Sequence, residues 1–526
     1  MGVQKINISH WQWPALCLLT LAIFLWLQSP ATLSDPDSFY HAGISVMMRD
    51  QGLIVDFPWT QSSLYKLFFI DHHFLYHVFL IPFVSIFNPL AGIKIATAIF
   101  ATLSTLSVLW LLKKNNIKGL VWWLLIMLTN SLFLFRMSLG KAPSLTLLIL
   151  IVGYYLINQY KYKSIFLWSW LFIWFYSAWP LLLVFTAITT TVESITDAYA
   201  VIKNTGSSLF SFFKLIIKNF FNKKNILLWA SVILGLTVGL VTNPYFPTNL
   251  IYLKYLFTMS ITPYYKIIQI GSEWYSWDLF EIMEHSALPI LVWTLSSIFF
   301  FATLKKQEKF SLVSWLSSLV LIIMTMRARR QIEYMVPWLV ISSALAWKDG
   351  LGKSSLHDLW KEFISWLPKI LRKKIFIYII GAYLLIILPL GVYKEVATTY
   401  TSLASGYKMS HLEKASTWLK NNAGVGEIVF NNSWSSFPML FYYNPHNLYL
   451  TGLDQTFMYE FDKNKHKLWT EAVDGKRSDY YEIAKDEFHA SWLLLEKKHP
   501  KSLYILNRDP RFQKVYQDDE AIIYKL

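Results

Sequence analysis

Two closely spaced carboxylates follow the first long apolar run of the sequence. The run "WPALCLLTLAIFLWLQSP" leads directly into "LSDPDSFYHAGISVMMRDQG" (33–52), which places Asp35 and Asp37 ahead of Tyr40 and His41. A carboxylate can take a proton from an attacking nucleophile or hold a divalent cation. The alternative is that both acids only solvate the start of a loop. The side of the membrane that this loop faces, and the groups that share it, decide between the two interpretations.

Further polar clusters contain residue types that suit the same chemistry. Each has a structural alternative: arginines and tryptophans can anchor the boundary of a membrane, and neighbouring His and Asp side chains on a helix diverge rather than converge on a metal. The clusters are Asp71-His72-His73; Arg136 with Gly140 and Lys141 in "RMSLGKAPSL"; Glu273 in "QIGSEWYSWDLFEIMEH"; and Arg327, Arg329 and Arg330 in "MRARRQIEYMVPW".

The composition indicates a polytopic membrane protein. The chain has 526 residues, of which 55% are hydrophobic and 17% aromatic, and its mean hydropathy is +0.37. Apolar runs of about 20 residues, the length that crosses a bilayer, recur along it. The net charge of +15 comes from lysines in short clusters between apolar runs, a pattern typical of cytoplasmic loops rather than of nucleic-acid binding. The single cysteine, Cys17, excludes an intrachain disulfide.

The basic clusters predict a topology with about eleven transmembrane helices, the N-terminus inside and the C-terminus outside. The segment 72–88 is expected to lie along the membrane within the first outer loop, because counting it as a crossing inverts everything after it. The lysine-rich run 208–225 reads as a cytoplasmic interfacial helix. The basic clusters are Lys113/Lys114/Lys118, Lys161/Lys163, Lys218/Lys223/Lys224, Lys305/Lys306/Lys309 and Lys361–Lys374. The helices are expected at 11–30, 91–112, 118–135, 144–159, 164–178, 180–197, 225–242, 286–304, 310–326, 332–347 and 375–393.

The chain changes character at about residue 400. Apolar runs shorten to strand length, as in "EIVFN", "LYLTG", "WLLLE" and "AIIYKL", and alternate with helical stretches. This alternation predicts a small α/β domain with a partly parallel sheet. We therefore expect a membrane domain at 1–398, with outer loops at 31–90 and 243–285, and an outer α/β domain at 399–526.

This topology brings the polar clusters to one outer face, where they suit group transfer from a lipid phosphate. Arginine forks match phosphate oxygens, and a carboxylate can act on the attacking group. A long amphipathic loop and aromatic belts would shape a groove for an isoprenoid chain.

The sequence resembles the GT-C glycosyltransferases, polytopic enzymes that use lipid-phosphate sugars and keep an essential acid in the first outer loop. It resembles the catalytic subunit of oligosaccharyltransferases in particular. The family's Asp-Pro-Tyr-Tyr-His loop compares with Asp37-Ser-Phe-Tyr40-His41. Its R-x-x-x-G motif compares with Arg136 and Gly140, its Ser-x-x-Glu loop points to Glu273, and its "RFTIYAVP"-like helix points to Arg330. An outer Trp-Trp-Asp motif compares with Trp434 in "NNSWSSFPMLFYYN".

The resemblance implies a set of site residues. Asp37 and Glu273 would be catalytic, with Asp35 a spectator, and seven further residues would bind substrate: Tyr40, His41, Arg136, Lys141, Arg329, Arg330 and Trp434. The family's second acidic pair is replaced here by Pro143 and Leu145, and no acid follows Trp434. Either Asp71 and His72 complete a metal site with Asp37 and Glu273, or the reaction needs no metal. The ion would be Mg²⁺ or Mn²⁺, with Zn²⁺ favoured only if histidines dominate the ligand set.

The leading hypothesis is therefore an inverting sugar transfer from a polyprenyl-phosphate or diphosphate donor to a glycan, lipid or protein acceptor. It would take place on the outer face of a bacterial cytoplasmic membrane, with membrane lipids but no nucleic acid as partners. A transporter or flippase is an alternative, but it predicts charges within the helices and two related halves, and we find no repeated halves. A non-catalytic scaffold for the C-terminal domain is the other alternative, and predicts that Asp37 is dispensable.

Overall fold

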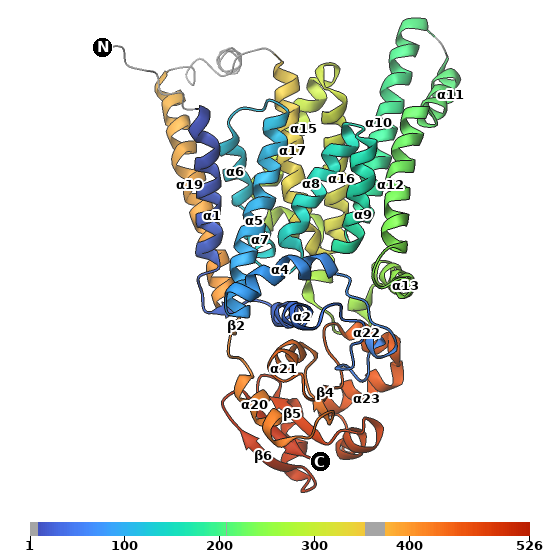
Figure 1. The fold of residues 1–526 in the computed structure, drawn as a ribbon. Helices are drawn as coiled ribbons and strands as arrows, with labels where there is room; N and C mark the ends of the chain where they lie inside the picture. Colours follow the sequence, from blue (N-terminus) through green and yellow to red (C-terminus); the bar gives the residue numbers. More distant parts are fainter. Residues whose placement is uncertain (1–8, 207, 353–373) are drawn as a thin grey trace.

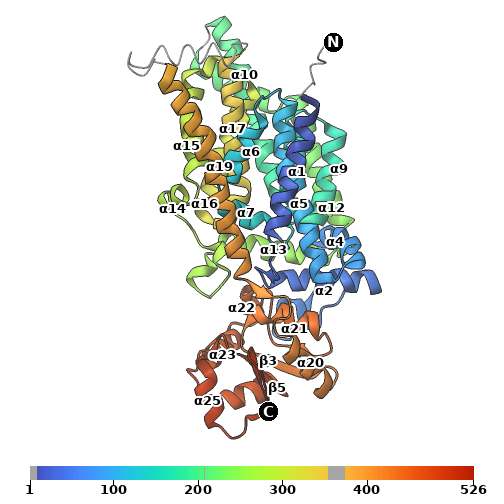
Figure 2. The ribbon, with the colours of Figure 1, turned by 90° about the vertical axis from the view of Figure 1, so that its left-hand side faces the viewer.

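The computed structural model describes residues 9–206, 208–352 and 374–526. Long helices form a bundle along one axis, and the C-terminal region (407–526) forms a separate α/β body at one end of it (Figure 1). We call this end of the bundle the domain end. Figure 2 shows the same two-part arrangement from the side, with the chain entering the C-terminal region from the long helix α19.

A helix occurs at each of the apolar stretches that the sequence predicts to be transmembrane, and the longer of these helices run side by side in the bundle (Figure 1). The bundle helices are α1 (Ser9–Leu27), α5 (Pro89–Lys114), α6 (Leu120–Leu128), α7 (Ser131–Met137), α8 (Pro143–Asn158), α9 (Tyr162–Phe175), α10 (Pro180–Thr205), α12 (Lys223–Val241), α15 (Ala287–Ala302), α16 (Lys309–Arg327), α17 (Ile332–Leu351) and α19 (Lys374–Ala404).

The predicted number of crossings is not confirmed. By length and composition, four of the described helices are apolar and long enough to span a membrane: α5, α10, α12 and α16. The number rises to six if each of two bent helix pairs, α6 with α7 and α14 (Leu279–His285) with α15, counts as one span. The count of about eleven crossings and the side that each end faces stay predictions.

The expectation of one continuous helix over 118–135 is wrong. The segment forms α6 and α7, which meet at an angle of 90°. Asn130 causes the break, because its side chain accepts a hydrogen bond from the Phe133 N–H at 2.7 Å and so starts a new helix. Its amide group also donates to the Ser286 hydroxyl at 2.8 Å. The break directs α7, and with it Arg136, toward the domain end.

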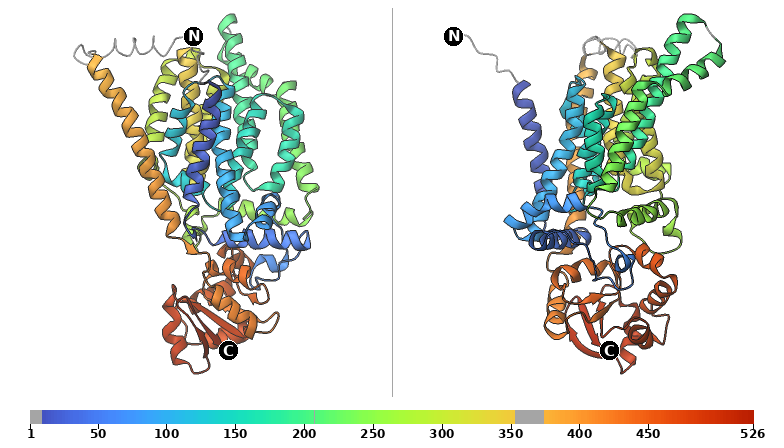
Figure 3. Two further views of the ribbon diagram at one scale, coloured as in Figure 1. Left: turned by 60° about the vertical axis from the view of Figure 1, so that its left-hand side comes forward. Right: turned by 45° about the vertical axis from the view of Figure 1, so that its right-hand side comes forward.

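Short elements cover the domain end of the bundle. Helices α2 and α4 lie across the bundle axis there (Figures 1 and 3), which places the segment 72–88 in the first loop as expected. The elements are β1 (Thr32–Leu33), α2 (Asp37–Gln51), α3 (Leu64–Leu67), α4 (Phe74–Ile86), α13 (Thr248–Ile261), α14, and the short 3₁₀ turns η1 (Tyr264–Lys266), η2 (Ser272–Trp274) and η4 (Arg329–Gln331).

The C-terminal region is built around a mixed five-stranded sheet in the order β4-β3-β5-β7-β6. Strand β3 is parallel to β4 and β5, whereas β7 is antiparallel to β5 and β6. The predicted partly parallel sheet is therefore observed. Its strands are β3 (Ile428–Asn431), β4 (Leu448–Tyr449), β5 (Trp492–Glu496), β6 (Gln513–Gln517) and β7 (Ala521–Lys525). The helices and turns around it are α20 (Glu413–Asn422), η5 (Trp434–Ser436), α21 (Phe437–Tyr443), α22 (Gln455–Phe461), α23 (Lys463–Val473), α24 (Tyr480–Glu482), the π-turn η6 (Ile483–Glu487), η7 (Pro500–Ser502) and α25 (Leu503–Arg508).

The first loop is joined to the C-terminal region by backbone pairing at two places. Strand β1 pairs antiparallel with β2 (Tyr407–Lys408). At the edge strand β4, the Tyr449 N–H donates to the Trp59 carbonyl at 2.8 Å, and the Gln61 N–H donates to the Tyr449 carbonyl at 2.7 Å. The predicted boundary at 398/399 lies within α19, and the division into two domains stays a prediction.

A histidine just before α20 links two glutamates of the C-terminal region. The His411 ring lies 3.1 Å from the Glu496 carboxylate and 3.0 Å from that of Glu520. Burial opposes protonation of this ring, but these contacts outweigh it and raise the pKa of His411.

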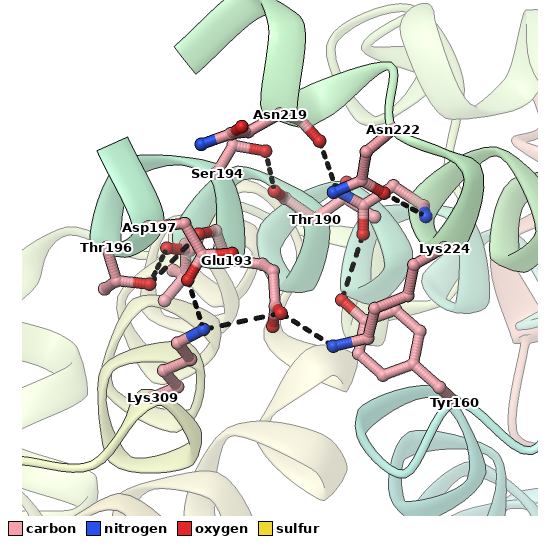
Figure 4. A network of polar contacts seen from close by, with 12 residues as sticks. Tyr160, Thr190, Glu193, Ser194, Thr196, Asp197, Asn219, Asn222, Lys224 and Lys309 are labelled. Carbon is pink, nitrogen blue, oxygen red and sulfur yellow. Dashed lines mark hydrogen bonds and ion pairs between the residues drawn. The ribbon is translucent and has the colours of Figure 1, made fainter. Parts of the chain in front are cut away.

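Charged side chains tie three helices together (Figure 4). The Glu193 carboxylate of α10 lies 2.6 Å from the ammonium of Lys224 on α12 and 3.4 Å from that of Lys309 on α16. The latter also lies 2.6 Å from Asp197. Next to this network, α11 (Leu209–Phe220) has no buried residues. The predicted cluster Lys361–Lys374 lies outside the described residues except for Lys374.

Candidate active site

Both carboxylates of the opening motif contact one lysine. The Lys141 ammonium lies 2.6 Å from Asp35 Oδ2 and 2.7 Å from Asp37 Oδ2. Asp37 is the first residue of α2, and the Asp37 N–H donates to Asp35 Oδ1 at 2.7 Å. The structure thus brings the predicted residues Asp37 and Lys141 together. Asp35 is buried and helps to hold both of them, so it is a supporting residue of this cluster rather than a solvated one.

The glycine before Lys141 permits this approach. A Cβ atom at position 140 would lie 2.7 Å from the Ser38 hydroxyl of α2, so a larger residue would push the loop away from the helix. The Ser144 hydroxyl then donates to the Lys141 carbonyl at 2.8 Å, which fixes the lysine backbone at the start of α8.

Arg136 joins two acids from distant parts of the chain. Its Nε donates to Glu333 Oε2 at 2.8 Å, and its Nη1 pairs with Glu273 of η2. Glu333 belongs to the first turn of α17 and is fully buried. The sequence analysis identified Arg136 and Glu273 but missed Glu333. A carboxylate within the apolar stretch "QIEYMVPW" was the signal that could have found it, because such acids are costly to bury without a role.

The two adjacent arginines 329 and 330 both reach this area. Arg330 Nη1 lies 3.5 Å from Glu273 Oε1, its Nη2 donates to the Tyr176 hydroxyl, and its guanidinium lies 4.4 Å from the Trp274 ring centroid. The Arg329 guanidinium lies 5.3 Å from the ring centroid of Trp277. Arg327 points elsewhere and donates to the Ile261 carbonyl at 2.6 Å.

Histidines of the first loop form a chain beside this cluster. His77 Nδ1 donates to Asp71 Oδ2 at 2.6 Å, and His77 Nε2 lies 2.7 Å from His41 Nδ1. The ring of His73 stacks on that of Tyr176, with centroids 5.3 Å apart. Sequence reasoning missed His77, which lies four residues after His73.

Two cavities meet at the cluster. The first has a volume of about 350 Å³ and includes Tyr40, His41, His72 and Tyr176 in its lining, together with apolar residues of α10, α13 and α16. The second has a volume of about 430 Å³ and is lined by Arg329, Trp277, Trp434 and residues of the 271–274 segment. Both volumes are in the range of small-ligand sites. The residues that line both cavities are Asp37, Arg136, Lys141, Glu273, Trp274, Arg330, Leu453 and Asp454.

The residues that line both cavities form a wall between them, which we call the shared wall, and the C-terminal region contributes to it. Asp454 lines both cavities and caps α22 by accepting the Thr456 N–H at 2.8 Å. Burial raises its pKa. Leu453, next to it, has a φ of +67°, a conformation that non-glycine residues adopt at a cost and that often marks a functional segment. Asp454 was missed by the sequence analysis, which considered only Trp434 in this region.

The four predicted metal ligands do not converge. Asp37 pairs with Lys141, Glu273 with Arg136, and Asp71 with His77, while His72 lies near the Tyr65 hydroxyl at 3.4 Å. Within the described ranges, no group of three or more His, Cys, Asp and Glu residues could hold a metal ion. The prediction of a divalent cation held by Asp37, Asp71, His72 and Glu273 is therefore not confirmed, and these residues do not fit it.

The acids at the shared wall differ in their tendency to ionise. Burial raises the pKa of Asp37 to about 6; the nearby Lys141 opposes this, and Asp35 adds to it. Glu273 is also buried, but Arg136, Lys141 and Arg330 outweigh that effect and hold its pKa well below its ordinary value. Glu273 is therefore a fixed anion, whereas Asp37 can exchange a proton near neutral pH, as a general base requires.

Solved structures share this architecture. An archaeal oligosaccharyltransferase, AglB from Archaeoglobus fulgidus in complex with an inhibitory peptide and a dolichol-phosphate, matches with a TM-score of 0.61 and 13% identity over 93% of this chain and 70% of that chain. ArnT from Cupriavidus metallidurans bound to undecaprenyl phosphate matches with a TM-score of 0.56 and 12% identity over 99% of this chain and 98% of that one. The fold is that of the GT-C glycosyltransferases.

Other comparisons define the limits of this likeness. The mycobacterial arabinofuranosyltransferase AftD matches with a TM-score of 0.53 and 10% identity, over 98% of this chain but only 40% of its own. No protein-family model and no curated protein matches the sequence. The resemblance that the motifs indicated is thus confirmed at the level of the GT-C fold.

Proposed function

We propose that the chain is a membrane glycosyltransferase that moves a sugar from a polyprenyl-phosphate or diphosphate donor to an acceptor at the domain end of the bundle. The observation that carries this proposal is the position of Asp37. Its carboxylate stands in a wall shared by two cavities of ligand size, beside Lys141 and on the same wall as Arg330. A base between two binding sites, with cations near it, is what transfer between two substrates requires.

The cavities differ in a way that favours one assignment of substrates. Leu181, Val184, Leu256, Met259 and Met324, from the helices α10, α13 and α16, line the first cavity, and such apolar side chains suit a lipid-linked donor. Leu453 and Asp454 of the C-terminal region line both cavities, and Trp434 of the same region lines the second. We assign the donor to the first cavity and the acceptor, a glycan, lipid or protein, to the second.

The proposed step uses Asp37 as the base. The carboxylate removes the proton of an acceptor hydroxyl, and the acceptor oxygen forms a bond to the anomeric carbon of the donor sugar. The bond between this carbon and the phosphate oxygen breaks, and its electron pair leaves with the lipid phosphate. Attack from the side opposite the leaving group inverts the anomeric carbon. The reaction written in this way uses no metal ion.

Arg330 is the group best placed to receive the leaving phosphate. Arg136 is held between two carboxylates and Lys141 between two others. Among the described residues, Arg330 contacts one carboxylate, that of Glu273 at 3.5 Å, beside the Tyr176 hydroxyl and the Trp274 ring, so its charge is the least compensated of the three. Its planar fork also fits two phosphate oxygens at once.

The proposal can be tested with protein in lipid nanodiscs and a panel of polyprenyl-phosphate sugars. Asp37→Asn keeps the size of the side chain but removes its basicity, and should reduce transfer by about 10²–10⁴-fold. Asp56→Asn, at an exposed acid of the same loop, is the matched control and should transfer like the wild type. Wild-type rates in Asp37→Asn at normal protein levels would refute the assignment. The polyprenyl-phosphate sugar that accumulates in a deletion strain would name the donor.

The proposed location is the bacterial cytoplasmic membrane, with the N-terminus inside and the C-terminal region outside. This orientation follows from the lysine clusters of the sequence and gives the site access to a donor on the outer leaflet. Reporter fusions at Gly350 and Ser405, at the two ends of the segment that includes α19, should report opposite sides. The same side for both fusions would contradict this orientation.

A further inference from the structure

We propose that the Lys141 ammonium takes the place of a divalent cation in this site, so that transfer proceeds without a metal ion. This inference rests on the proposed transfer function and specifies how its charges are balanced. A divalent ion in such a site would bridge carboxylates and face the substrate phosphate. In this chain the bridging position between the carboxylates of Asp35 and Asp37 is held by Lys141, at 2.6 Å and 2.7 Å.

Lys141 and its two carboxylate partners are largely shielded from solvent, unlike an ion pair on the protein surface. The side chains of Lys141, Asp35 and Asp37 are 17%, 11% and 28% exposed, so solvent screens their attraction little. Gly140 lets the loop approach α2 at Ser38, as shown above. The ammonium is thus held by Asp35 and Asp37, and the backbone of Lys141 is held by Ser144 at the start of α8.

Within the part of the chain that the structure describes, no group of three or more His, Cys, Asp and Glu residues could hold a metal ion, and most other acids of the site already have partners. Asp454, which lines both cavities, caps α22 by accepting the Thr456 N–H. Glu273 pairs with Arg136 and contacts Arg330, and Glu333 pairs with Arg136 from the opposite side. Asp71 accepts hydrogen bonds from the His77 ring at 2.6 Å and from the His73 N–H at 3.0 Å. A cation entering between these acids would have to displace a protein cation or the hydrogen bonds of a buried carboxylate, which leaves a buried charge uncompensated.

Lys141 retains capacity for a ligand. An ammonium group has three N–H donors, and among the described residues only Asp35 and Asp37 lie within ion-pair distance of Lys141. Since Lys141 lines both cavities, the third donor is available to an oxygen of the donor phosphate or of the acceptor. The lysine therefore holds Asp37 in place as a base and supplies positive charge at the point where the two substrates meet.

The first test uses wild-type protein and needs no variant. Excess EDTA should change the transfer rate by less than about twofold, because a chelator does not remove an ammonium group. Transfer that EDTA abolishes and that Mg²⁺ or Mn²⁺ restores would overturn this inference while leaving the proposed function intact. Absence of transfer both with and without metal, from every donor of the panel, would overturn the proposed function and this inference with it.

The second test removes the ammonium. Lys141→Met keeps the length of the side chain, and its transfer rate should fall by about 10²–10³-fold, as for the loss of one preorganised cation or donor. Added Mg²⁺ or Mn²⁺ should not restore it. The matched control is Lys66→Met, at an exposed lysine of the first loop whose ammonium donates to the Gln61 side chain at 2.9 Å. A Lys141→Met variant with the wild-type rate would overturn the inference.

A binding measurement separates the two explanations independently of activity. Electron paramagnetic resonance of added Mn²⁺ should show no wild-type binding that depends on Asp37. Bound Mn²⁺ that is lost in Asp37→Asn would overturn the inference, because it would show that the carboxylate accepts a metal in the presence of Lys141.

Discussion

The transfer rate at limiting substrate should fall as the pH drops through about 6. Asp37 acts as a base only when it is ionised, and burial raises its pKa to about 6. With this pKa, the ionised fraction falls about tenfold between pH 7 and pH 5. Activity is therefore present above the pKa and lost below it, which is the sign expected for a carboxylate that must give up its proton before it reacts.

Two substitutions should shift the acid limb of the pH profile, the range in which activity falls as the pH drops, in opposite directions. The negative charge of Asp35 raises the pKa of Asp37, and the positive charge of Lys141 lowers it. Asp35→Asn removes the first effect and can still accept the Asp37 N–H, so its limb should lie at lower pH than that of the wild type. Lys141→Met removes the second effect, so its residual activity should show a limb at higher pH.

The assay is kcat/KM for the lipid-linked donor between pH 5 and pH 8, which reports the ionisations of the free enzyme. Asp56→Asn serves as the control and should give the wild-type profile. A limb that stays at the same pH in both Asp35→Asn and Lys141→Met would refute the assignment of Asp37 as the titrating base, even if all three proteins are active.

Three other changes probe separate parts of the structure. Arg330→Lys keeps the charge but loses the fork, so it should raise the KM for the donor and reduce transfer less than Asp37→Asn does. Trp434→Ala should raise the KM for the acceptor by about tenfold, the loss expected for one stacking contact, and leave the KM for the donor unchanged. His411 has a raised pKa in the folded protein, so its stabilising effect is complete below its unfolded pKa of about 6.5 and is lost as the pH rises through the folded value. The Tm deficit of His411→Gln should thus be largest at low pH and shrink at high pH.

The helical framework could be predicted because its signals are local. Apolar runs with the length of a helix formed helices, and short apolar runs such as "WLLLE" formed strands. The break at Asn130 was missed because an amide in an apolar run is compatible with both a helix interior and a cap. Its contact with Ser286, between α14 and α15, depends on the fold. The pairing of β1 with β2 was not predicted either, because strands of two residues have no periodicity to detect.

The site was predictable to the extent that its residues belong to linear motifs. Asp37, Arg136, Lys141, Glu273 and Arg330 were identified in this way and all line the same two cavities. Their partners could not be identified, because pairing depends on the fold. Nothing in the sequence indicates that Arg136 is neutralised from two sides by acids 137 and 197 residues away, or that the acid after Leu453 reaches the same wall.

The cations of the shared wall are already paired with carboxylates before any substrate binds, and this affects how a bound donor shifts the pKa of Asp37. In the free protein, Lys141 and Arg136 are each held between two carboxylates, and Glu273 is shared with Arg330. A bound donor adds the negative charge of its phosphate to this wall, and a nearby like charge favours the protonated form of Asp37. The limb of kcat, which reports the enzyme with its substrates bound, should therefore lie at higher pH than the limb of kcat/KM. A donor analogue with an uncharged linkage in place of the phosphate should bind without this shift. If the two limbs coincide, or if kcat has the more acidic one, then the phosphate does not bind near Asp37 and the assignment of the first cavity to the donor is wrong.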